Sequence, residues 1–221
     1  MSSVVDICNV ALSHLGNARR VAAIDPPDGT AEADLCSVFY PIARDEMLEA
    51  ADWSFARKRV ALSLLSTNDS TVWAYAYGKP ADSIMYRRIV TGIATAFEVD
   101  SEAFDSEGDV IYTNKADAVM LYTKALSDPT KFPPTFHSAL SYMLASYLAG
   151  PILKGDEGAK AGQTLRKGAM ALAMSAASSD SNRTFLDNLP FPSGLLARNG
   201  SRGSTAPSTD VNDYGTGYAV N

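Results

Sequence analysis

The sequence predicts a mainly α-helical protein of the α+β class, a helical bundle with a small embedded antiparallel β-region and an extended C-terminal arm. Three observations support this prediction. Apolar residues recur at helical spacing on both sides of the middle third, they alternate with small residues within it, and the chain turns polar from Ser178 onward. We therefore expect one folded domain over residues 1–178 and an arm over residues 179–221.

The first helix is expected over about residues 3–16. Ser3 and Asp6 are spaced like a capping pair, in which each side chain binds the backbone N–H of the other residue. Gly16 is placed to end the helix, because glycine readily adopts the left-handed conformation found after helix C-termini. The segment 25–29 contains two adjacent prolines and predicts a rigid turn that cannot be helical.

A second helix is expected over about residues 30–51, with Thr30 as its N-cap. Larger apolar residues recur along this segment at helical spacing, so they predict the face that is buried. This stripe consists of Leu35, Phe39, Ile42 and Leu48.

Two later helices are expected over about residues 134–150 and 156–177. Pro134 can start the third helix, since proline is tolerated in a first turn. Gly150-Pro151 is expected to interrupt or end it, and Gly155 reinforces the break. The fourth is rich in alanine and glycine. Small side chains let helices approach closely, so we expect it to pack against another helix.

The β-region is expected over about residues 60–124. Trp73, Tyr75 and Tyr77 alternate with small residues, which is typical of a strand with one aromatic face, and we expect this face to pack on helices. The polar stretch 100–109 is expected to be a hairpin-like turn. The remaining strand candidates are residues 84–90, 96–99, 110–113 and 118–123.

Composition excludes several classes of protein. The chain has 19 lysines and arginines against 25 aspartates and glutamates, a net charge of −6, so it does not offer the basic surface that grips nucleic acid. Two cysteines, Cys8 and Cys36, are too few for a disulfide scaffold and indicate a reducing compartment. They could meet across packed helices, but with His14 and His137 as the chain's two histidines we expect no metal site and no cofactor.

Charged clusters offer no specific sign of catalysis. The acid pairs Asp45-Glu46 and Asp105-Glu107 could serve a glycosidase, yet adjacent acids are usually solvated surface. The basic clusters 57–59 and 87–88 are expected to be ion-pair partners for the abundant acids, within the subunit or across an interface. We therefore expect no enzyme, and the alternative left open is a hydrolase of cell-envelope polysaccharide that uses a carboxylate pair.

No secretory signal is expected, because the N-terminus lacks a basic segment followed by an apolar one. The longest stretch without charged residues, 132–153, contains prolines and several polar residues, so we expect no membrane span.

The polar arm contains an apolar island that a purely solvated tail would not need. We expect this island to anchor the arm on a partner or on a neighbouring subunit. The anchors are Phe185, Leu186, Leu189, Phe191, Leu195 and Leu196.

A series of short motifs follows in order along residues 1–178 and includes Ile7-Cys8-Asn9, Arg44-Asp45, Trp53-Ser54-Phe55-Ala56 and Pro80-Ala81-Asp82. This ordered series resembles the phage tail tubular protein A family, the head-to-tail adaptor or gatekeeper ring of short-tailed, T7-like bacteriophages. The residues that we take as its markers, mostly structural, are Cys8, Asn9, Leu12, Gly16, Tyr40, Arg44, Asp45, Trp53, Phe55, Trp73, Tyr77, Pro80 and Asp82.

The resemblance implies a structural virion protein that is assembled in the host cytoplasm and resides at the head-tail junction. It implies a twelvefold homo-oligomeric ring that binds the portal protein above and the nozzle protein, tail tubular protein B, below, with tail fibres as further partners in phages that carry them. DNA would meet the ring only as cargo during ejection. Twelve subunits of −6 carry about 72 negative charges, which predicts a channel that repels phosphate.

Overall fold

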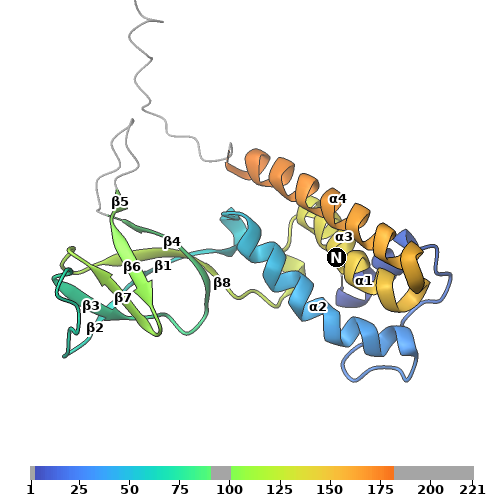
Figure 1. Ribbon diagram of the computed structural model, residues 1–221, viewed down its shortest axis with the longest axis horizontal. Coiled ribbons are helices and arrows are strands. Elements are labelled where there is room, and N and C mark those ends of the chain that lie inside the picture. The colour runs from blue at the N-terminus through green and yellow to red at the C-terminus, as the bar shows by residue number, and fades with distance from the viewer. Residues whose placement is uncertain (1–2, 91–100, 182–221) are drawn as a thin grey trace, which may run out of the picture. The chain divides into compact units, whose positions relative to one another are not determined.

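The structure is a computed structural model that describes residues 3–90 and 101–181 (Figure 1). Its α+β class confirms the prediction: four helices accompany two antiparallel sheets of four strands each. All of these elements belong to one unit of the chain, Met1–Phe185. The predicted strand at 96–99 and all six arm anchors lie outside the described residues.

The helices lie at the two ends of the described sequence and the strands lie between them. The helices are α1 (Val4–His14), α2 (Ala31–Ala50), α3 (Pro134–Leu153) and α4 (Gly155–Ser181). The strands are β1 (Arg57–Ala61), β2 (Ser63–Leu64), β3 (Tyr75–Gly78), β4 (Ser83–Val90), β5 (Ser101–Glu102), β6 (Phe104–Glu107), β7 (Val110–Thr113) and β8 (Val119–Lys124). Short 3₁₀ turns occupy Ser54–Ala56 and Pro129–Lys131.

Both N-terminal helices begin where the sequence predicts. The Ser3 hydroxyl accepts a hydrogen bond from the Asp6 N–H, and the Asp6 carboxylate accepts one from the Ser3 N–H, so the capping box is complete. Gly16 has a φ of +71°, which is the left-handed conformation expected after the helix. Thr30 caps α2 through the Ala33 N–H.

The buried face of α2 differs from the predicted stripe. Leu48 is buried, but Leu35 and Phe39 are only partly buried and Ile42 is 48% exposed. The face that α2 turns toward the core it shares with α3 is thus rotated from the predicted stripe and combines small and large side chains. The buried residues of α2 are Ala33, Cys36, Tyr40, Ala43, Met47 and Leu48.

The prediction that α3 ends or is interrupted at Gly150-Pro151 is wrong, because the helix continues to Leu153. Pro151 removes one backbone hydrogen bond. The buried face of α3 nevertheless packs against three other helices, and this packing offsets the lost hydrogen bond. The break comes at Lys154 and Gly155, which have φ values of +59° and +58°, so the part of the prediction that rests on Gly155 is confirmed.

Helices α3 and α4 pack closely, as the small residues of the fourth helix predict. A Cβ atom built on Gly158 would lie 2.7 Å from the Ala149 carbonyl oxygen, and one on Gly162 would lie 3.0 Å from that of Ser146. The first distance leaves no room for a Cβ atom, so Gly158 requires glycine, and at Gly162 a Cβ would push the Ser146 carbonyl by a few tenths of an ångström. This contact is the most extensive between any two elements in the described ranges.

The β-region contains two sheets, with strand orders β1-β8-β4-β5 and β2-β3-β7-β6. The predicted turn at 100–109 is therefore wrong for most of its length. β5 and β6 lie within it, and the reversal is confined to the tight turn before β7, where Gly108 has a φ of +49°. Edge strands with charged side chains lack the apolar alternation that marks a buried strand, which is why these two escape detection.

The aromatic strand β3 covers Tyr75 and Tyr77 but excludes Trp73, which precedes it and is half-buried. Tyr77 is buried together with Ile89, Met120 and Tyr122 of the other sheet. The expectation that this aromatic face packs on helices is thus wrong, because a second sheet takes that place. The β-region has a core of its own, separate from that of the helical bundle.

The α3–α4 contact gives a matched stability test. Gly158→Ala is expected to lower the free energy of unfolding by about 1–3 kcal/mol, because the methyl group forces the two helices apart. Gly150→Ala is the control, since its Cβ meets nothing within 4 Å and it should be neutral or raise stability by about 0.4–1 kcal/mol. Urea unfolding measures both values. Equal effects would show that the contact is looser than described.

Candidate functional site

The markers on α1 hold the N-terminal part of the bundle together. The Asn9 side chain binds the backbone of Val21 twice, donating to its carbonyl at 3.0 Å and accepting from its N–H at 2.8 Å. Cys8, Leu12 and Cys36 are fully buried. Hydrogen bonding with the Cys36 thiol, together with burial, raises the pKa of the Cys8 thiol, so this cysteine stays protonated.

Tyr40 and the neighbouring residues of α2 line a groove of about 610 Å³ beside the loop at residues 22–27. Burial raises the pKa of Tyr40 to about 12, and its hydroxyl has no partner among the described residues. Arg44 lies at the groove and forms a 2.8 Å ion pair with Asp45. The walls are largely apolar and carry no group arranged for bond chemistry.

The residues after α2 anchor the bundle from its end. Trp53 is buried, and its indole N–H donates to the Met47 carbonyl at 2.8 Å. Its ring meets the ring of Phe136 edge-on, with the centroids 5.0 Å apart. Phe55 contacts both of these rings and that of Phe132. The two aromatic residues of the Trp-Ser-Phe-Ala motif therefore form an aromatic cluster that packs the end of α2 against the start of α3.

The markers in the β-region are also structural. The Tyr77 hydroxyl donates to the Lys115 carbonyl at 2.9 Å, and the backbone of Trp73 is held by Asn68 and Ser70. The Pro80 carbonyl accepts hydrogen bonds from Ser83, which fixes the turn into β4.

Asp82 is the centre of a small network. Its carboxylate accepts hydrogen bonds from Lys58 and from the Tyr122 hydroxyl, each at 2.6 Å. These bonds lower the pKa of Asp82, because they stabilise its charged form. The Asp82 network ties the β3–β4 turn to β1 and β8.

Two long-range contacts at the end of α2 carry no signal in the sequence. Arg87 of β4 donates to the carbonyls of Leu48, Glu49 and Ala51 at 2.6–3.3 Å, and to the Thr123 hydroxyl at 2.9 Å. Each contact spans 36 residues or more along the chain. We call this arrangement the Arg87 clamp, because one guanidinium joins the first sheet to the end of a helix.

Asp180 provides the second long-range contact. It is 6% exposed and accepts hydrogen bonds from the N–H and the hydroxyl of Ser54 at 2.6 and 2.7 Å. The last turn of α4 is thereby fixed to the segment between α2 and β1. Asp180 belongs to the part of the chain that we expect to be arm, yet α4 includes it and continues to Ser181.

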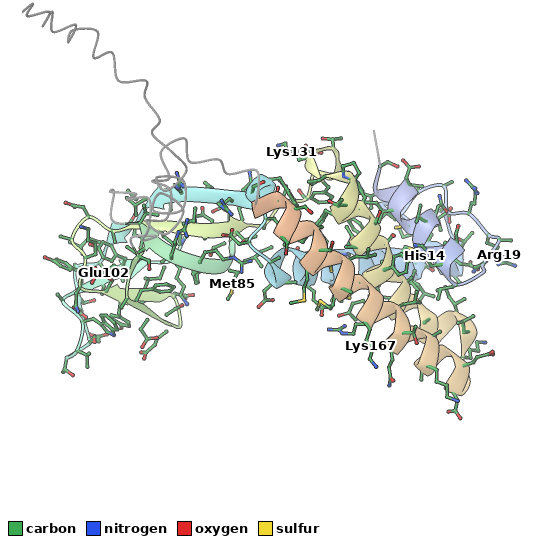
Figure 2. All side chains as sticks on the ribbon, turned by 90° about the horizontal axis from the view of Figure 1, so that it is seen from above. His14, Arg19, Met85, Glu102, Lys131 and Lys167 are labelled. Atoms are coloured by element: carbon green, nitrogen blue, oxygen red, sulfur yellow. The ribbon has the colours of Figure 1, made fainter. Side chains whose placement is uncertain are left out.

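The structure brings the two histidines together, which their positions in the sequence do not predict. His14 at the end of α1 (Figure 2) and His137 near the start of α3 line one groove of about 220 Å³. The His14 Nε2 lies 3.3 Å from the Ser141 hydroxyl, and its ring lies 4.1 Å from that of Tyr142. Burial lowers the pKa of both imidazoles. Asp6, Ser138 and Ser141 line the same groove, and the buried His137 Nδ1 has no hydrogen-bond partner among the described residues.

The candidate acid pairs lie in separate surroundings. Asp45 is bound by Arg44, while Glu46 accepts a 2.6 Å hydrogen bond from Tyr147 and pairs with Arg166. Asp105 and Glu107 are exposed on β6. A glycosidase needs two carboxyl groups that face each other across a substrate cleft. Neighbouring carboxylates bound to different cations do not provide that arrangement.

Across residues 3–90 and 101–181, no group of three or more histidine, cysteine or acidic residues is placed to hold a metal ion. The helices within these ranges include none that is both long and apolar enough to cross a membrane. Comparison with the models of known protein families finds no match, and neither does a search of curated proteins.

The Arg87 clamp can be tested against its neighbour in sequence. Arg87→Ala is expected to lower the free energy of unfolding by about 2–3 kcal/mol, because charged hydrogen bonds to the end of α2 are lost. Arg88→Ala is the control. Arg88 has no hydrogen bond or ion pair with another described residue, so its loss should change stability by less than about 0.5 kcal/mol. Chemical denaturation compares the two variants.

The histidine groove predicts a pH dependence of stability. Both folded-state pKa values lie below 6.5, so the unfolded chain binds more protons under mildly acidic conditions. Stability should be complete above pH 6.5 and should fall as the pH drops below it. The nearby Asp6 favours a charged His137 and opposes this only weakly. Denaturation at pH 7.5 and 5.5 measures the effect.

The double variant His14→Gln and His137→Gln should flatten this dependence, since these are the chain's two histidines. Ser138 lines the same groove but does not titrate, so the variant Ser138→Ala should retain the pH dependence. A slope that survives in the glutamine variant would assign the pH dependence to other groups.

Proposed function

We propose that this chain is a structural protein of a short-tailed bacteriophage virion, the adaptor that forms a ring between the portal and the tail nozzle. The observation that supports the proposal is the ordered series of family markers over residues 1–178. These residues make contacts that connect one structural element to another. Asn9 binds the backbone of Val21 in the first loop, and Trp53 and Phe55 pack on the ring of Phe136 in α3. Asp82 connects the β3–β4 turn to Tyr122 of β8. Proteins that share an architecture are expected to keep the residues that connect its elements.

The activity of such a protein is geometric. Repeated head-to-tail contacts between copies close a ring, and the ring presents one surface to the portal and another to the nozzle. A net charge of −6 on each copy favours passage of DNA, because like charges along a channel repel phosphate. This model requires no cofactor and no metal.

The described structure gives the arm a fixed starting point. Asp180 holds the last turn of α4 against Ser54, so the residues after Ser181 leave from a defined place on the folded unit. The apolar anchors begin at Phe185, only four residues further along the sequence. When an anchor lies a few residues from a fixed helix end, fewer residues are ordered on docking, so less conformational entropy is lost than with a long flexible segment.

Imaging by negative stain tests the proposed function directly. The purified protein should form rings, or caps on the portal when portal is added, since many ring proteins assemble only on their docking platform. Particles without either feature, at concentrations where portal remains intact, would overturn the proposal.

The arm should be truncated after Ser181 rather than before Asp180, because Asp180 is part of the folded unit. Removal of residues 182–221 is expected to leave the melting temperature almost unchanged and to weaken portal binding at least about tenfold, since each buried apolar anchor contributes about 1.5–3 kcal/mol. Calorimetry and a pull-down on immobilised portal measure the two effects.

A full-length comparison separates the anchors from the length of the arm. Phe185→Ser with Leu189→Ser and Phe191→Ser should weaken binding like the truncation. Ser193→Ala with Ser201→Ala and Ser204→Ala is the matched control and should bind normally. Unchanged binding in both the truncated and the serine variant would refute a role for the arm.

A further inference from the structure

The face of the first sheet that points away from the β-region's core carries two arginines, one on each side of Leu121, which is itself only 1% exposed. Val60, Met120 and Ile89 pair across β1, β8 and β4 and point into the β-region's core. The next row along these strands is Arg59, Leu121 and Arg88, and it lies on the opposite face because side chains alternate along a strand. We call Arg59 and Arg88 the arginine pair.

The arginine pair is not neutralised within the described part of the chain. The neighbouring cations are all engaged: Arg57 with Asp52, Lys58 with Asp82, and Arg87 with the end of α2. Arg59 is exposed and Arg88 half-buried, and neither forms an ion pair with another residue that the structure describes. Two like charges on one sheet face repel each other, which favours an anionic partner.

The second sheet ends in an acidic strand. β6 is an edge strand, and Phe104 packs toward the core, so Asp105 and Glu107 share the opposite face. Both are exposed and without an ion pair in the described ranges. We call Asp105 and Glu107 the acidic edge.

The spacings of the two patches are compatible. The Cα atoms of Asp105 and Glu107 lie about 6.8 Å apart, since they are two residues apart on one strand. Those of Arg59 and Arg88 lie about 9.5 Å apart, because one strand separates them. The arginine side chains are long enough for their guanidinium groups to approach each other and to match the shorter separation of the two acidic residues. Charges on an edge strand also prevent strand addition, a role that fits Arg59 on the edge strand β1 but not Arg88, because β4 lies between β8 and β5.

We propose that the arginine pair of one copy of this chain binds the acidic edge of the next copy, head to tail. The inference rests on the proposed function for its ring. A head-to-tail contact uses two different patches on each copy, and when its rotation closes it generates a ring. The partner is therefore a second copy of this chain, and the contact is an electrostatic one whose strength falls as salt is added.

Cysteine cross-linking tests the contact without relying on portal. Ala61 and Ala103 are exposed, and each lies two residues from a charged partner, Arg59 and Asp105 respectively. The variant Ala61→Cys with Ala103→Cys should give a ladder of oligomers on a denaturing gel after treatment with a short bismaleimide. The native Cys8 and Cys36 are fully buried and should not react. Ala61→Cys with Ala171→Cys, which places the second thiol on exposed α4, should give no ladder.

Charge reversal then identifies the residues. Adding Arg59→Glu and Arg88→Glu to the cross-linking variant should reduce the ladder at least about tenfold, because like charges now face each other. Adding Asp105→Lys and Glu107→Lys as well should restore it. A ladder that is absent, that equals the Ala171 control, that survives reversal or that is not restored would overturn the inference.

The cross-linking result and the imaging result distinguish failure of this contact from failure of the proposed function. Portal caps in negative stain without a ladder would keep the adaptor proposal and remove this contact. A ladder with rescue but no rings and no portal caps would keep the contact and remove the adaptor.

Discussion

The carbonyl groups at the end of α2 have no partner within the helix, and the Arg87 clamp satisfies three of them from the first sheet. Ladder irregularities on both sides of Tyr86 accompany this placement of the guanidinium. Because the Thr123 hydroxyl binds its Nε, the side chain is also fixed on the strand side. The two hydrophobic cores are separate, so a polar contact of this kind gives the β-region a defined attachment to the bundle.

The short segment between α2 and β1 is held from several directions. Trp53 fills the core of the bundle, Ser54 is bound by Asp180 from the end of α4, and Arg57 pairs with Asp52 at 2.9 Å. A connection of so few residues would otherwise be free to pivot. In the ring that we propose, every copy must repeat the same geometry, and a fixed connection would keep small angular errors from accumulating around the circle.

Local signals predict much of this fold, and long-range packing accounts for most errors. The caps at Ser3 and Thr30 are correct because capping depends on residues three positions apart. The continuation of α3 past Pro151 could not be predicted, since contacts with other helices offset the lost hydrogen bond. Tyr77 was assigned the right strand but the wrong covering layer, because alternation shows that a face is buried and not what buries it. Asp180 lies 126 residues from Ser54, and no spacing rule connects them.

The reversal between α3 and α4 limits how proteins of this architecture can diverge in length. Lys154 alone separates the two helices, so there is no loop to absorb an insertion. One added residue would rotate α4 by about 100° relative to α3 and would carry Gly158 and Gly162 away from the carbonyls that they approach. Asp180 would turn away from Ser54 by the same angle. Related chains should therefore keep the number of residues from Ser146 to Asp180 constant, and differences in length should accumulate elsewhere.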